Sequence, residues 1–123
     1  HPALRYGLGL SDAGFFWESH EILEAVWAAA PQGGRARILL RACIQIANAN
    51  LKLRMKKSNA ALRLFGEALT ELNELGVRKA TAGGAGFADG FPSTALAAEL
   101  KLRLTQGVLT AADWLDISAA TRS

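Results

Sequence analysis

The chain has 123 residues, of which half are hydrophobic and a fifth charged, and its formal net charge is +3. This composition fits one folded domain with a single hydrophobic core, and it excludes a disordered chain. It also excludes a membrane-spanning protein, because no uncharged apolar run reaches the ~18 residues that a span needs. A single cysteine, Cys43, in an apolar run and the lack of a secretory signal in the first residues favour a cytoplasmic protein with a buried thiol.

The first half of the chain predicts two long helices. The first is expected from about Asp12 to Ala30, with Ser11 or Asp12 as its N-cap and the sequence at 31–34 as its end. The second is expected over residues 35–57 and is apolar on two sides, with a narrow polar stripe between them. A helix of this kind lies at the centre of its bundle, or also contacts a second subunit, so a homodimer through residues 35–57 is one prediction. The stripe consists of Arg41, Gln45, Asn48 and Lys52.

The second half predicts two more helices on either side of a loop. One is expected from Ser58 or Asn59 to about Leu75, with Gly76 just past its end. Residues 80–92 contain four glycines and predict a loop. Residues 93–106 predict a helix, because strong helix formers open the segment, even though its second half alternates as a strand would. A short further helix is predicted around Trp114.

Two polar features of the second helix have structural explanations. Asn50 falls on its apolar side, where an unpaired amide would cost ~1–3 kcal/mol, so we expect it to be hydrogen-bonded. Four cations cluster near its end, where they complement the helix dipole. A solvated helix end therefore explains them better than a nucleic-acid patch, so we do not expect nucleic acid as a partner. We expect no membrane partner either, because no segment is long and apolar enough to span a membrane. The cluster comprises Lys52, Arg54, Lys56 and Lys57.

The first helix carries the constellation that could support chemistry. His20 lies within its apolar face, and Glu24, four residues later, is close enough for the side chains to meet. Such a pair can act as general acid and base or supply two metal ligands. The string His-Glu-x-x-Glu lacks the second histidine of zinc proteases, so no metal site is predicted. Alternatively, the cluster is a structural network in which Glu24 also pairs with Arg41.

The same residues resemble a known family. His20-Glu21-Ile22-Leu23-Glu24-Ala25-Val26-Trp27 is similar to the His-Glu-x-Leu-Glu-x-x-Trp signature of small bacterial and archaeal proteins called the domain of unknown function 309 family. The resemblance covers residues 11–75 and implies a compact multihelical fold, but it implies no activity. The chain has Arg41-Ala42 where the family often has Gln-Gly, and Asn50-Leu51 where many members carry a histidine, which argues further against a shared metal site.

The sequence thus predicts an all-α, compact bundle of about four main helices that forms one domain over residues 1–123. It leaves two functions open: a ligand-binding or acid/base site, or a non-catalytic dimerisation or binding module in which the same cluster is structural. It names no cofactor and does not decide whether the protein is an enzyme. The candidate catalytic residues are His20 and Glu24, and the candidate binding residues are Phe16, Trp27, Arg41, Gln45 and Asn48.

Overall fold

The computed structural model describes residues 2–32, 34–77 and 91–121 of the chain. Within these residues the chain forms helices and no strand, so the predicted all-α class is confirmed, with more helices than the four expected. The predicted loop at 80–92 lies outside the described residues, except for Phe91 and Pro92. The elements are α1 (Pro2–Asp12), α2 (Phe16–Ala29), α3 (Arg35–Arg54), α4 (Ser58–Val77), α5 (Ser93–Gln106), the 3-10 turn η2 (Ala111–Asp113) and α6 (Ile117–Thr121).

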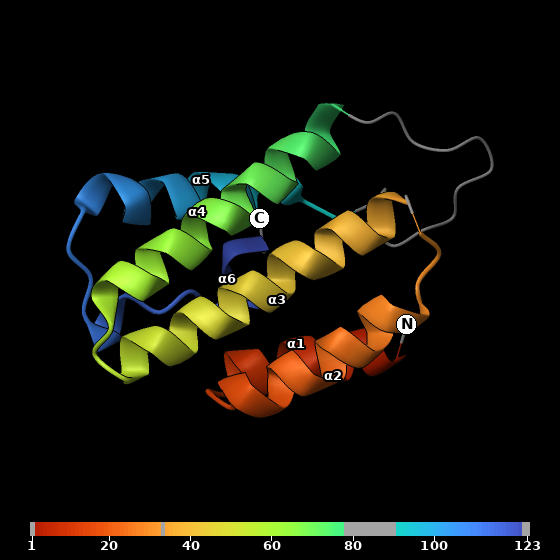
Figure 1. Cartoon of the computed structure of the whole chain (residues 1–123), viewed down its shortest axis with the longest axis horizontal. Coiled ribbons are helices and arrows are strands. Elements are labelled where there is room, and N and C mark those ends of the chain that lie inside the picture. Colours follow the sequence, from red (N-terminus) through yellow and green to blue (C-terminus); the bar gives the residue numbers. More distant parts are fainter. Residues whose placement is uncertain (1, 33, 78–90, 122–123) are drawn as a thin grey trace.

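Helix α3 runs through the middle of the bundle (Figure 1). The pair α1–α2 packs against one side of it and α4 against another, while α5 covers α4 and α6 contacts α1 and α5. These contacts bury one apolar side of α3 and part of the other, on which Ile44 and Leu51 stay partly exposed. Leu39, Ala42 and Ile46 are buried, and so is Leu40.

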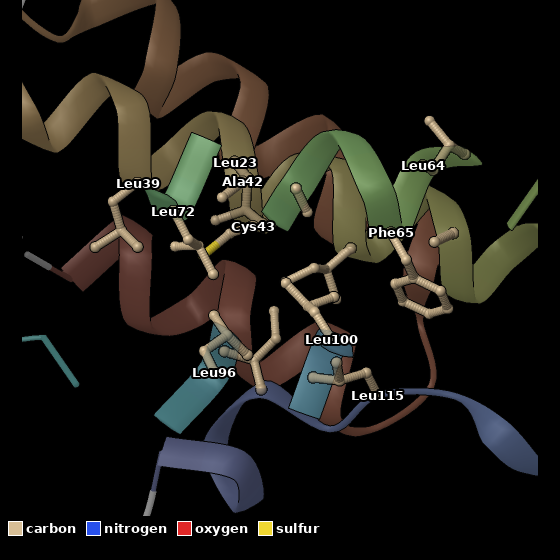
Figure 2. Packing of buried hydrophobic residues seen from close by; sticks show 14 of the residues in the cluster. Leu23, Leu39, Ala42, Cys43, Leu64, Phe65, Leu72, Leu96, Leu100 and Leu115 are labelled. Carbon is tan, nitrogen blue, oxygen red and sulfur yellow. The ribbon is translucent and has the colours of Figure 1, made fainter. Parts of the chain in front are cut away.

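The hydrophobic core draws side chains from all six described α-helices and from the segments on either side of η2. Figure 2 shows Leu23 of α2, Cys43 of α3, Phe65 of α4 and Leu100 of α5 converging on one cluster, which Leu115 closes. Burial raises the pKa of the Cys43 thiol to about 12, so the expected buried, unreactive thiol is confirmed. None of the helices among the described residues is long and apolar enough to cross a membrane.

The start of the chain differs from the prediction. Residues 2–12 form a helix that the sequence pattern did not predict, and Ser11 and Asp12 belong to it instead of capping the next one. The chain then turns at Gly14, whose φ of 91° favours glycine, and α2 begins at Phe16. Tertiary contact explains α1: Gly7 lies so close to α2 that an added Cβ would come within 2.9 Å of Leu23 Cδ2.

Later boundaries are closer to expectation. Helix α3 ends at Arg54, three residues before the predicted end, and α4 continues through Gly76 to Val77. The Ser58 hydroxyl does not cap α4 but accepts a hydrogen bond from the backbone N–H of Leu109, at 2.9 Å. The helix predicted at 93–106 is confirmed as α5. Trp114 is not in a helix, since it lies between η2 and α6.

Candidate functional site

The side chains of His20 and Glu24 meet on the surface of α2. Nε2 of His20 lies 2.7 Å from Oε2 of Glu24, as their spacing of four residues predicts. The His20 side chain is 18% exposed and that of Glu24 55% exposed, so the histidine is held against the bundle and the carboxylate reaches solvent. Nδ1 of His20 is buried and has no hydrogen-bond partner within the described part of the chain. The histidine is therefore fixed at one nitrogen only.

Aromatic rings border this pair along α2. The ring of Trp17 lies 5.4 Å from that of His20, at an angle of 42°. The indole of Trp27 is covered by the guanidinium of Arg37, 4.0 Å from the ring centre, in cation–π geometry. Trp17 and Trp27 thus stand at the two ends of the His20–Glu24 pair.

Phe16 lies elsewhere. Its ring is buried and packs 5.7 Å from that of Trp114, with the guanidinium of Arg54 over it at 4.5 Å. Phe16, predicted as a binding residue, therefore lies away from His20, and the ring next to His20 is that of Trp17. Trp17 is exposed and was not among the site residues predicted from the sequence.

A small pocket opens between α2 and α3 next to Glu24. Its volume is about 150 Å³, and it is lined by Glu24, Trp27, Arg41, Ile44 and Gln45. Four of these five residues were predicted as site residues, and they come from two consecutive helices. His20 does not line the pocket but holds Glu24, which does. The structure thus gathers most of the predicted cluster around one concavity.

Two glutamates of α4 complete the polar surface. Nε of Arg41 lies 3.2 Å from Oε1 of Glu71, and Nε2 of Gln45 donates to Oε2 of Glu67 at 3.0 Å. The predicted pairing of Glu24 with Arg41 is therefore replaced by an ion pair of Arg41 with Glu71. Partial burial raises the pKa of the Glu71 carboxyl above its ordinary value, Arg41 lowers it in part, and neighbouring glutamates raise it further.

Sequence reasoning missed Arg37, Glu67 and Glu71. A signal existed for each: Arg37 is four residues before Arg41 on the same stripe, and the glutamates are four residues apart on the polar face of α4. The sequence does not show that α4 packs beside the polar stripe of α3, so the glutamates could not be assigned to the site.

The two asparagines of α3 have different surroundings. Asn48 is half-buried and lies one turn beyond Gln45, and it does not line the pocket. Asn50 is buried and exchanges two hydrogen bonds with the backbone of Leu115, at 2.9 and 2.8 Å, which confirms the expected pairing. Asn50 is therefore a structural residue.

The arrangement offers a carboxylate, a guanidinium and an amide beside an indole. Among the described residues, no three His, Cys, Asp or Glu side chains are grouped so that they could hold a metal ion. The chemistry available is therefore hydrogen bonding and charge pairing with a small polar group, along with proton exchange at Glu24 and His20.

The comparisons with known proteins identify the family of the chain and no site within it. Residues 4–64 match the family model DUF309, described as a domain of unknown function. The chain belongs to the DUF309 family. The match covers α1, α2, α3 and the start of α4, and hence every site residue predicted from the sequence. No curated protein and no solved structure matches the chain.

Proposed function

We propose that this DUF309 protein is a binding module whose pocket between α2 and α3 takes one small polar group of a ligand. The observation that carries the proposal is the convergence of Glu24, Trp27 and Arg41 on one concavity. A carboxylate and a guanidinium beside an indole supply charge, hydrogen bonds and apolar contact, the three components of most ligand sites.

The size of the pocket limits the ligand. Sites for drug-sized molecules usually have volumes of ~300–1,000 Å³, whereas this one measures about 150 Å³. It therefore accommodates a group of about the size of a single amino-acid side chain. The ligand is either a very small molecule or a larger one that inserts one group.

The polar groups define the chemistry of that group. Glu24 accepts from His20 through one oxygen, which leaves its other oxygen as an acceptor. Arg41 uses Nε for Glu71, which leaves its terminal nitrogens as donors. A ligand group that both donates and accepts hydrogen bonds, such as a carboxamide, can donate to Glu24 and accept from Arg41. Glu24 is then the ligand-contacting residue and His20 the residue that positions it, in place of the acid/base role first expected for His20.

The alternative of a dimerisation module has less support. Its motivation was the second apolar side of α3, where packing within the chain buries Leu40 and leaves Ile44 and Leu51 only partly exposed. Ile44, which is half-buried, faces the small pocket and supplies its apolar floor.

An NMR titration tests the proposal with three probes of similar size: propionamide, propionate and propylammonium. We expect propionamide to shift the indole N–H signal of Trp27 saturably, with the millimolar affinity typical of a ligand of few atoms. The two ions should bind more weakly, because propionate is repelled by Glu24 and propylammonium by Arg41. The indole of Trp114, which packs against Phe16 instead, is an internal control.

Two variants complete the test. Glu24→Ala should abolish the Trp27 shift, whereas Glu21→Ala, which removes an exposed carboxylate of the same helix, should preserve it. Equal shifts of all three indoles, or no shift of Trp27 with any probe, would contradict a pocket at this site.

A further inference from the structure

Three turns meet at the end of the bundle opposite the N-terminus of α1 (Figure 1). They are residues 13–15 between α1 and α2, residues 55–57 between α3 and α4, and residues 107–110 after α5. The guanidinium of Arg54 donates to the carbonyl of Gly14, which joins the first turn to the second. The bond from Leu109 to Ser58 joins the third to the second. We call this surface the three-turn end.

Each of the three turns exposes a large apolar side chain. Phe15 is 52% exposed, Met55 46% and Val108 76%. Single exposed apolar residues are common on protein surfaces, but here one stands on each of three adjoining turns. The pocket between α2 and α3 uses none of them.

The three-turn end also carries the positive charge of the protein. Lys52, Lys56 and Lys57 have no ion-pair partner within the described residues, and Arg54 bonds to a neutral carbonyl. Apart from these four cations, the chain has ten basic and eleven acidic side chains, so its net charge of +3 arises from this cluster.

Two carboxylates at the same end are engaged in local hydrogen bonds. Asp12 accepts from Ser118, and Asp113 accepts from the backbone N–H of Thr110 at 2.8 Å. They lower the local charge without pairing with the lysines.

Lys56 occupies a position that usually favours glycine. Its φ is 61°, in the left-handed region, where it closes the end of α3. The N–H of Lys57 bonds to the carbonyl of Lys52 at 2.8 Å in the same turn. Glycine is the usual residue at such a helix end, because a side chain there is strained. A lysine at this place keeps a charge at the tip of the turn at a cost in backbone energy.

We propose that the three-turn end binds the surface of an anionic lipid bilayer, with Phe15, Met55 and Val108 entering the headgroup region and the lysines contacting lipid phosphates and carboxylates. Apolar side chains ringed by cations are typical of proteins that lie on a membrane without crossing it. A nucleic-acid surface would use the cations but would leave Met55 and Val108 without a role. The earlier expectation of no membrane partner rested on the lack of a spanning segment, which does not bear on surface binding.

The test is co-sedimentation of the full chain with vesicles of phosphatidylcholine, with and without phosphatidylserine. We expect binding only when phosphatidylserine is present, and we expect added salt to weaken it. One lysine near an anionic surface contributes about fivefold to the partition coefficient. Lys56→Gly should therefore lower vesicle binding about fivefold. The separate variant Phe15→Ser should also lower vesicle binding, and by a larger factor, because it removes an apolar side chain from the headgroup region.

The Lys56→Gly variant separates binding from folding. Glycine relieves the left-handed strain at this position, so its unfolding midpoint should stay the same or rise while vesicle binding falls. Arg5→Ala is the matched control, because it removes one exposed positive charge from the first turns of α1, away from the three-turn end. This variant should bind vesicles like the parent protein.

Three outcomes would overturn the proposal. The first is equal binding to vesicles with and without phosphatidylserine, and the second is equal loss in Lys56→Gly and Arg5→Ala. The third is retention by a short DNA or RNA duplex at low salt with no binding to any vesicle, which would assign the cluster to nucleic acid.

Discussion

Two polar sites next to α3 differ in how completely their hydrogen-bonding groups are used. Asn50 is fully buried, and both ends of its amide bond to the backbone of Leu115. His20 is fixed to Glu24 at one nitrogen, while its other nitrogen is buried without a partner among the described residues, and Glu24 is half exposed. A closed network holds the fold together, whereas an open one keeps hydrogen-bonding capacity for a ligand. Asn50→Ala and Glu24→Gln test this contrast directly, and substitutions at Gly7 and Asp116 compare it with the contacts of α1.

The largest effect is expected at the closed site. Asn50→Ala removes two hydrogen bonds and leaves the backbone N–H and C=O of Leu115 buried without partners, which should lower the free energy of unfolding by about 3 kcal/mol. Denaturant unfolding followed by circular dichroism measures the change. Asn48→Ala, on the half-buried side of the same helix, should change it by less than about 0.5 kcal/mol. Similar losses in both variants would contradict the structural role of Asn50.

The contact of α1 with α2 is the next closed region. In Gly7→Ala, the new Cβ would lie 2.9 Å from Cδ2 of the fully buried Leu23, so α1 or the Leu23 side chain must shift, at a cost of about 1–2 kcal/mol. Gly9 has no atom within 4 Å of such a Cβ, so Gly9→Ala should stabilise the protein by about 0.5 kcal/mol through helix propensity. The same unfolding experiment compares them, and opposite signs are the expected result.

A smaller, pH-dependent effect is expected where α1 meets α6. Burial raises the pKa of Asp12 above its ordinary value of 3.8; hydrogen bonds from Ser118 lower it in part, and Asp116 raises it. Because the folded pKa is the higher one, the stabilising contribution of protonated Asp12 is complete below 3.8 and is lost as the pH rises through the folded value.

Asp116→Asn removes the repulsion and can still cap α6, where Asp116 accepts from the N–H of Ala119. We expect a gain of about 0.5 kcal/mol at neutral pH, kept small because Asp12 is only half-buried. The gain should vanish in acid below the ordinary pKa of aspartate. Unfolding curves across this pH range measure it, and a gain that is independent of pH would point to a cause other than Asp12.

The smallest effect is expected at the open site. Glu24→Gln keeps an acceptor for the His20 N–H and removes only the charge of a half-exposed side chain, so the stability should change by less than about 0.3 kcal/mol. This variant thus allows binding studies of the pocket in a folded protein. A loss of several kcal/mol would mean that the His20–Glu24 pair is a structural tie, as in the alternative reading of the sequence.

Much of the local structure could be predicted because it depends on short-range signals. Helical periodicity identified α3 and α4, and helix propensity identified α5. The spacing of four residues identified the contact of His20 with Glu24. The burial of Cys43 and the pairing of Asn50 also followed from the helix pattern, since polar or reactive groups on an apolar face must be shielded or hydrogen-bonded.

Other features depended on partners distant in sequence. The pattern of residues 2–12 is interrupted by Gly7 and Gly9, and α1 is explained only by its close approach to α2. Arg41 pairs with Glu71 instead of Glu24 because α4 packs beside the polar stripe of α3, and Phe16 turns to Trp114, almost a hundred residues away. The sequence by itself determined helices α2 to α5 and the chemical groups that they carry. Only the tertiary structure decided which groups share the pocket, because that depends on how helices pack and not on spacing along one helix.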